Sequence, residues 1–341
     1  MLRARSSKAV GMAFWGALAV VTAFAPARAQ SFAPGKPLTL IVGNTPGSGY
    51  DTYGRLIARY MSGHLPGRPS IVVQNMPGAG SVKATEYLYS IAPRDGSVFG
   101  LIMPGALVDP LATDPKKYRY EASKFEFIGT ADSGTRVCFT SARSGVKTIE
   151  DAQKRKVAVA STPRADFTYM LNALAKTQFQ IVSGYPGPNE IMLALERGEG
   201  DAVCGLDFTA VNSLRPGLLG SDKVNILVQI ALEPKPFLSA LGVPEVWKYI
   251  PVEDRPVVEL MVGEQVVQRP FLAPPGTPAD RIGALRAAFD AALKEPELLD
   301  AAKKGNLEIN PKSGAEVAAQ IKSMYSAPKE VVERMGRVAR P

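Results

Sequence analysis

The 341-residue sequence has little of what most catalytic and metal sites require, because it contains only two cysteines and one histidine. A zinc site needs about four clustered nitrogen or sulfur ligands, and this composition offers no such cluster. A Ser-His-Asp or Cys-His mechanism would have to use His64, which stands beside the stop signal of a predicted helix. A histidine there is favourable to the helix C-terminus, so we expect a structural role. We therefore predict no enzyme activity, no metal and no cofactor.

The sequence also has no long apolar run beyond its N-terminal segment, and no basic run interleaved with aromatic residues. Residues 1–29 combine a basic start, an uncharged apolar stretch and an Ala-Arg-Ala site, the pattern of a cleaved secretory signal peptide. An uncleaved anchor is the alternative. Removing this segment takes four basic residues from the formal charge of +8. The mild excess that remains favours small anions and gives no support to nucleic-acid binding.

The two cysteines, Cys138 and Cys204, both lie in short apolar runs that are typical of strands. A secreted protein folds in an oxidising compartment, where two cysteines pair more often than they stay free. We therefore predict a Cys138–Cys204 disulfide. The alternative is two buried thiols that act as small apolar side chains.

The first ordered stretch is predicted to be a buried strand at 38–42, a glycine turn, and a helix with an apolar face from Tyr53 to Met61. Unpaired N–H groups and the helix dipole make the start of such a helix an anion site without any charged side chain. The alternative is that the turn is only a tight connection between strand and helix.

The same strand–turn–helix order recurs along the chain. It predicts an α/β protein in which ligands bind at the carboxyl ends of parallel strands. Strands at 125–129 and 136–140 are expected to begin a second lobe, Ser81 to cap a helix, and residues 234–256 to form a long surface connection. Capping boxes are predicted at 148–151 and 313–316. The remaining predicted strands are 70–74, 98–103, 157–160, 179–182, 201–204 and 224–230.

Five motifs in order make the chain similar to the Bug-type extracytoplasmic receptors of tripartite tricarboxylate transporters, from about residue 37 to 311. The motifs are P-G-S-G-Y-D at 46–51, N-M-P-G-A-G at 75–80, A-P-R-D-G at 92–96, Tyr185 and Gly187 with Gly198 and Asp201, and A-P-P-G-T-P-A at 273–279. Each motif alone is weak, and their joint order and spacing is specific.

The resemblance implies a two-lobe type II periplasmic binding protein fold, with each lobe a mainly parallel sheet flanked by helices. Lobe one would contain residues 30–129 and 232–341, and lobe two residues 130–231, so that the chain crosses the hinge twice. The lobes would close on a small carboxylate, such as a dicarboxylate, a tricarboxylate, an amino acid or an aromatic acid. The implied partner is an inner-membrane permease of large and small subunits, and we expect a monomer.

The predicted ligand site combines the loops of both lobes. Its residues are Asn44, Gly47, Ser48, Gly49, Tyr50, Gly80, Ser161, Thr162, Arg164, Asp166, Tyr185, Gly187 and Asp207. Asn44 and Tyr50 depart from the family pattern, and either tyrosine could stack on an aromatic acid or pack in the core. Arg164 could pair with a carboxylate or be an exposed loop residue. Asp166 could cap its helix, which we prefer, or meet an amino or hydroxyl group, and Glu190 would compete with a bound anion.

The predicted fold is compatible with three functions. The leading prediction is a receptor that binds and releases a solute for transport. The alternative is a periplasmic sensor subunit that presents its closed form to a sensor kinase. An enzyme on the same fold is the third, and it lacks a convincing acid–base pair.

Overall fold

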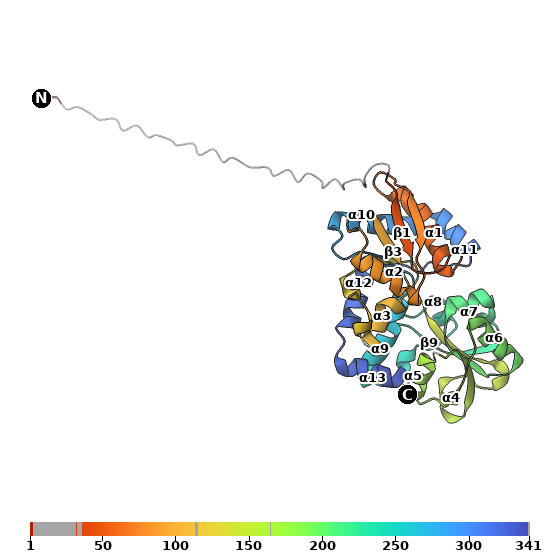
Figure 1. Ribbon diagram of the computed structural model, residues 1–341. Coiled ribbons are helices and arrows are strands. Elements are labelled where there is room, and N and C mark those ends of the chain that lie inside the picture. Colours follow the sequence, from red (N-terminus) through yellow and green to blue (C-terminus); the bar gives the residue numbers. More distant parts are fainter. Residues whose placement is uncertain (3–31, 33–35, 113–114, 164, 340–341) are drawn as a thin grey trace.

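The computed structural model describes residues 1–2, 32, 36–112, 115–163 and 165–339 (Figure 1). The predicted signal peptide lies outside the described residues, apart from its first two, and so does Arg164. None of the described helices is both long enough and apolar enough to cross a membrane.

The described strands form two mixed sheets, one with six strands in the order β11-β4-β10-β3-β1-β2 and one with five in the order β7-β6-β8-β5-β9. The first contains β1 (Leu38–Val42), β2 (Ile71–Asn75), β3 (Val98–Leu101), β4 (Glu126–Thr130), β10 (Pro270–Ala273) and β11 (Lys312–Ser313). The second contains β5 (Arg136–Ser141), β6 (Val157–Ser161), β7 (Phe179–Ser183), β8 (Ala202–Asp207) and β9 (Val224–Ile230).

Each sheet has a parallel part and an antiparallel part, which differs from the mainly parallel sheets of the prediction. Parallel pairs join β2 to β1 and β1 to β3, and also β7 to β6 and β6 to β8. The strands β4, β10, β5 and β9, by contrast, pair antiparallel. These are the strands by which the chain leaves one sheet or returns to it, without the crossover helix that parallel pairing of neighbours requires.

The strand at the end of the first half belongs to the first sheet, so the prediction that it begins the second lobe is wrong. β4 pairs with β10 and β11 through Phe271 and Ser313, both opposite Gly129. The chain then passes through residues 131–135 and enters the second sheet at β5. The prediction missed the pairing of β4 with β10 and β11. Both partner strands come from the last quarter of the sequence, so no local pattern around β4 indicates this pairing.

Helices cover both faces of the sheets. They are α1 (Gly49–His64), α2 (Val82–Ser90), α3 (Gly105–Ala112), α4 (Ile149–Lys154), α5 (Asp166–Leu174), α6 (Pro188–Arg197), α7 (Phe208–Leu214), α8 (Pro236–Ala240), α9 (Arg255–Gly263), α10 (Ala279–Ala292), α11 (Pro296–Lys304), α12 (Gly314–Tyr325) and α13 (Lys329–Ala339). Residues 234–256 were expected to be a surface connection, but they contain α8 and bury Leu238, Val246 and Ile250. The helix that opens at the predicted capping box of 313–316 is α12, and one more helix, α13, follows it.

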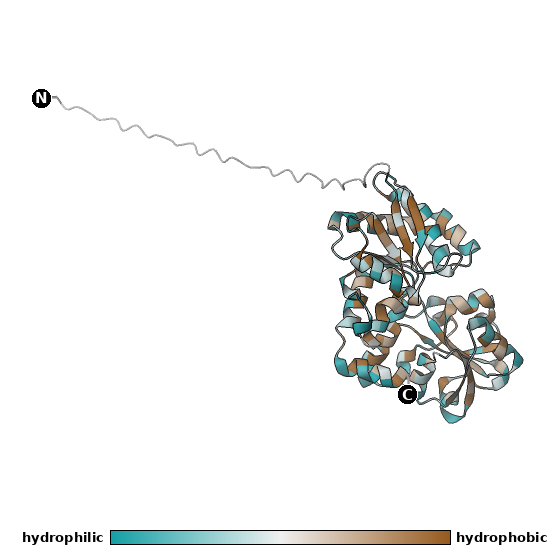
Figure 2. Cartoon of the chain, in the orientation of Figure 1, coloured by the Kyte–Doolittle hydropathy of each residue, from teal (hydrophilic) through white to brown (hydrophobic). Residues whose placement is uncertain are grey.

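The hydrophobic core follows the two sheets, whose strands are largely apolar in Figure 2. In the first sheet, Leu40 and Val42 pack with α1 and α10, whereas Ile41 faces α2, α3 and α12. This alternation is expected of a strand with helices on both faces. In the second sheet, one cluster joins α5 to α9 and α13, so the C-terminal helices pack beside α5 (Figure 1).

The predicted disulfide is confirmed: Cys138 on β5 is bonded to Cys204 on β8. The two residues lie directly opposite each other in the antiparallel pair of strands. The bond therefore links neighbouring strands in the middle of the second sheet, where Cys138 is fully buried.

Candidate functional site

The β1–α1 turn is held by the buried carboxylate of Asp51, a residue of the first helical turn. Its oxygens accept hydrogen bonds from Gly47 N–H (2.8 Å), Asn75 Nδ2 (2.9 Å) and Arg55 Nε (3.0 Å). Burial raises the pKa of Asp51, but these hydrogen bonds outweigh it and keep the pKa below its ordinary value. The N–H of Gly47 is therefore occupied by a hydrogen bond inside the turn, which the sequence did not predict.

The donors left at the start of α1 are the N–H groups of Gly49 and Tyr50. Ser48 occupies the N-cap position, and its hydroxyl accepts a hydrogen bond from Asp51 N–H at 3.3 Å. The N–H groups of the first helical turn have no acceptor within the helix. Asn44 closes the turn from the other side, since its carbonyl accepts a hydrogen bond from Asn75 Nδ2 at 2.9 Å.

The β2–α2 turn has an unusual backbone. Gly78, Ala79, Gly80 and Ser81 have successive positive φ values of 145°, 46°, 60° and 75°. Ser81 occupies the N-cap position of α2 as predicted, but its hydroxyl makes no cap hydrogen bond with that helix. Its Oγ instead donates to the carbonyl of Gly43 (2.8 Å) and accepts from the N–H of residue 103 (3.0 Å). Ser81 thus joins the carboxyl ends of β1 and β3.

The loops of the second sheet lie at the carboxyl ends of β6 and β7. Ser161 is buried at the end of β6, and its carbonyl accepts a hydrogen bond from Tyr185 N–H at 3.4 Å. The Tyr185 hydroxyl donates to Glu199 at 3.2 Å, so it is engaged on the surface. Gly187 is the N-cap of α6. Thr162 follows β6, and Asp166 is the first residue of α5. The N-cap of α5 is Ala165, so the preferred prediction that Asp166 caps this helix is wrong.

Asp207, at the end of β8, caps α7. Its Oδ1 accepts hydrogen bonds from Thr209 N–H (3.0 Å) and Ala210 N–H (3.4 Å). Its Oδ2 is buried and has no partner among the described residues. One oxygen of Asp207 is therefore structural, and the other is free for a further donor.

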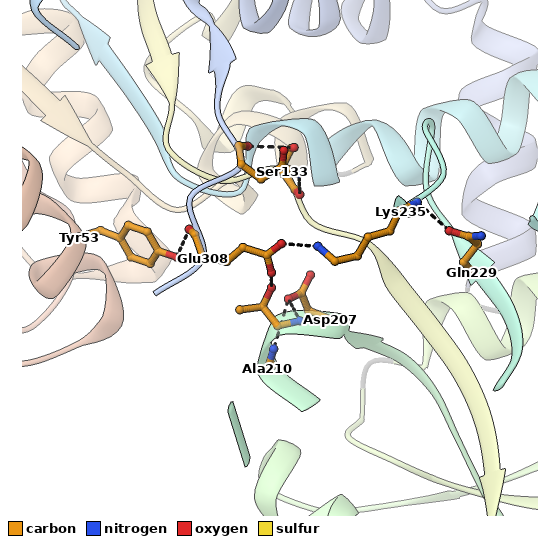
Figure 3. Close-up of polar contacts among 9 residues, drawn as sticks. Tyr53, Ser133, Asp207, Ala210, Gln229, Lys235 and Glu308 are labelled. Atoms are coloured by element: carbon orange, nitrogen blue, oxygen red, sulfur yellow. Dashed lines mark hydrogen bonds and ion pairs between the residues drawn. The ribbon is translucent and has the colours of Figure 1, made fainter. Parts of the chain in front are cut away.

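Glu308 connects the two halves of the molecule beside Asp207 (Figure 3). Its carboxylate contacts Lys235 and the hydroxyl of Thr209, and its carbonyl accepts a hydrogen bond from the Tyr53 hydroxyl at 2.7 Å. Tyr53 belongs to α1 and Thr209 to α7. A single residue thus ties a helix of the first sheet to a helix of the second.

Tyr50 contacts a residue that the sequence did not single out. The Cζ atom of Arg269 lies 4.5 Å from the centre of the Tyr50 ring and 5.1 Å from that of Tyr53. Arg269 Nη1 donates to the Tyr50 hydroxyl (3.3 Å) and to the carbonyl of Gln268 (2.9 Å). Burial raises the pKa of Tyr50, and the positive charge of Arg269 opposes that rise.

Asp132 is the second residue that was missed. It is 4% exposed, and its Oδ1 has no hydrogen-bond partner among the described residues. Burial, reinforced by the negative charges of Asp207 and Glu308, raises its pKa to about 7 against the opposing charges of Arg269 and Lys235. One sequence feature could have drawn attention to both missed residues. Asp132 and Arg269 are charged residues that stand beside the apolar runs of strands β4 and β10.

A cavity of about 770 Å³ lies beside this region, lined by residues that include Ser133, Lys235, Glu308, Asn310 and Lys312. Its two lysines are both paired, Lys235 with Glu308 and Lys312 with Glu233 at 2.8 Å. The cavity therefore offers no unpaired lysine to an anion.

No cluster of histidine, cysteine, aspartate or glutamate suited to a metal ion occurs among the residues that the structure describes. His64 ends α1 and contacts Glu295, which agrees with the structural role expected for it.

Comparisons with known proteins agree with this architecture. No protein-family model matches the chain. The "UPF0065 protein in tcbD-tcbE intergenic region" of Pseudomonas sp. (strain P51) is 25% identical over 318 residues, which cover 89% of this chain and 88% of that protein.

Solved structures with the same fold include a TctC solute binding protein from Polaromonas without ligand (TM-score 0.69, 18% identity, 89% of this chain and 100% of that one). MatC from Rhodopseudomonas palustris with bound malate has a TM-score of 0.56 and 20% identity, over 90% of this chain and 100% of that one. The periplasmic binding protein BugD has the same two values, over 90% and 98%. These likenesses confirm the fold that the Bug-type motifs predicted.

Proposed function

Because the chain shares the fold of the TctC and BugD solute-binding proteins, we propose that it is a periplasmic receptor that captures a small carboxylate and delivers it to a tripartite tricarboxylate-type transporter. The partner would be a membrane permease of large and small subunits. The receptor would act as a monomer, and it would bind and release its ligand without changing it.

The observation that supports this function best is that both sheets contain neighbouring parallel strands, each followed by a turn and a helix. The strands β2, β1 and β3 are parallel neighbours in one sheet, and β7, β6 and β8 in the other. Ligands of such sheets bind at the carboxyl ends of the strands. There the chain presents the free N–H groups at the start of α1 and the loops after β6 and β7, which suit a desolvated carboxylate.

We further propose that the two halves close on the ligand by a hinge motion, as two-lobe binding proteins do. Lobe one would comprise residues 30–129 and 232–341, and lobe two residues 130–231. The ligand would contact the predicted loop residues on both sides, Arg164 included. The bound malate of MatC is a small dicarboxylate, which gives the first acid to test.

The test is a thermal-shift screen of purified protein against mono-, di- and tricarboxylates, amino acids and aromatic acids, followed by calorimetry. An acid that binds only the folded state at about 100 times its Kd stabilises the protein by about 2.7 kcal/mol. A domain of this size then melts several degrees higher, at roughly 2–4 °C per kcal/mol. The proposal fails if every acid leaves the melting temperature unchanged and produces no heat of binding.

A further inference from the structure

We propose that Arg269 and Asp132 form a two-part ligand subsite. Arg269 binds a carboxylate of the ligand, and Asp132 accepts a hydrogen bond from a hydroxyl or ammonium group next to that carboxylate. This inference rests on the proposed function, because it specifies the chemistry of the acid that the receptor takes. Neither residue lies in the loops that the motifs single out.

The guanidinium of Arg269 is fixed on one side and free on the other. Nη1 donates to the Tyr50 hydroxyl and to the Gln268 carbonyl, at 3.3 Å and 2.9 Å. Nε is buried without a partner, and Nη2 donates to none of the described residues. The free Nε–Nη2 edge is one of the planar faces with which arginine binds a carboxylate through two parallel hydrogen bonds.

Among the described residues, Arg269 also has no carboxylate close enough to form an ion pair. The arginines Arg55, Arg215 and Arg334 form ion pairs with carboxylates at 3.0, 2.5 and 2.5 Å. Arg269 forms no ion pair with any carboxylate of the described chain, and its guanidinium lies over the rings of Tyr50 and Tyr53. A partly buried cation without an anion is costly, so this arrangement favours an anion supplied from outside.

The hydroxyl of Thr130 holds the backbone of Asp132 next to that of Arg269. That hydroxyl accepts a hydrogen bond from the backbone N–H of Arg269 (3.0 Å) and donates to the backbone carbonyl of Asp132 (2.8 Å). The two residues thus lie at the adjoining ends of β4 and β10, where Thr130 is opposite Pro270. Asp132 Oδ1 is fully buried and unpartnered, so a donor on the ligand would satisfy it.

The charges around Asp132 come from several elements. Asp207 ends β8, Glu308 precedes β11, Lys235 precedes α8, and Arg269 precedes β10. The two carboxylates repel an anionic ligand group placed close to Asp132, whereas the cation of Arg269 attracts one. The subsite therefore selects acids whose carboxylate carries a neighbouring donor over acids that carry none.

Calorimetry with L-malate, L-aspartate and succinate tests this inference, because these four-carbon diacids differ only in the group next to one carboxylate. We expect the wild-type protein to bind malate or aspartate about 10- to 100-fold more tightly than succinate, the range of one charge-assisted hydrogen bond. Arg269→Gln should weaken all three acids by a similar factor. Asp132→Ala should remove the preference and leave succinate nearly unchanged.

The control variant is Arg59→Gln. The Cζ atom of Arg59 also lies over a tyrosine ring, 5.7 Å from the ring centre of Tyr60, and both residues belong to α1. Unlike Arg269, Arg59 has an exposed side chain. It should bind as the wild-type protein does. If Arg269→Gln does not fold, phenylglyoxal labelling of the wild-type protein replaces it: saturating ligand should protect Arg269 from modification and leave Arg59 reactive.

The outcomes separate this inference from the proposed function. Unchanged affinities in Arg269→Gln, or equal labelling of Arg269 with and without ligand, overturn the arginine part while the receptor function stands. Equal binding of succinate and both substituted acids overturns the role of Asp132. Failure of the wild-type protein to bind any carboxylate overturns the receptor function and this inference together.

Discussion

Replacing Asp132 with asparagine should make the protein more stable, by an amount that grows with pH. The side chain keeps its shape in Asp132→Asn but cannot ionise. In the wild-type protein, burial moves the pKa of Asp132 from 3.8 to about 7, so the folded state holds the proton more tightly than the unfolded state. Stability therefore falls as the pH rises from about 4 through 7, and the loss is complete above pH 7.

The magnitude follows from the size of this pKa change. Each unit is worth about 1.4 kcal/mol, so ionising Asp132 costs the folded state about 4 kcal/mol at most. About 2–3 kcal/mol of this loss falls between pH 5 and pH 8. The difference in the free energy of unfolding between Asp132→Asn and wild type should grow by that amount over this range.

Urea unfolding at pH 5, 6, 7 and 8 measures that difference, and contributions from titrating groups that do not interact with Asp132 cancel in it. The matched control is Asp222→Asn, which makes the same change at an exposed position. If the difference for Asp132→Asn stays constant within about 0.5 kcal/mol from pH 5 to pH 8, burial does not raise the pKa of this carboxyl and the reasoning is refuted.

Four further predictions concern single features of the structure. Ser81→Ala should lower the free energy of urea unfolding by about 1–3 kcal/mol, because one buried and one partly buried backbone group lose their partner; a neutral result would contradict this. Removing both cysteines should cost about 2–4 kcal/mol, and mass spectrometry without reductant should show the wild-type bond intact. Glu308→Gln should cost about 1–2 kcal/mol, whereas Glu233→Gln, whose ion pair is exposed, should cost under about 0.5 kcal/mol. Gly47→Val should abolish carboxylate binding in calorimetry without unfolding the protein; Gly217→Val, which has the same φ of 77° far from the turn, should still bind.

The candidate site divides into parts that the sequence could predict and parts that it could not. The turns after β1, β2, β6 and β7 were recognisable, because glycine and proline punctuate apolar runs over a few residues. The hydrogen bonds inside these turns were not. Asp51 takes up the N–H of Gly47, and the Tyr185 hydroxyl donates to Glu199. Such choices depend on side-chain directions, which a pattern of residue types does not contain.

Local interactions are what the sequence determined by itself. The capping boxes at Thr148–Asp151 and Ser313–Glu316 form as predicted, because each joins residues only three positions apart. The succession of strand, turn and helix along the chain and the pairing of Cys138 with Cys204 were also predictable. The first follows from hydrophobic periodicity, and the second from the fact that two cysteines allow only one bond.

Only the tertiary structure decided which distant residues share one environment. Arg269 meets Tyr50 across 219 positions of the sequence, and Glu308 meets Tyr53 across 255. Neither pair has a local pattern, because each contact exists only when the last quarter of the chain returns to the first sheet as β10 and β11. The raised pKa of Asp132 has the same origin: its four charged neighbours come from four other segments of the chain, and folding alone brings them together.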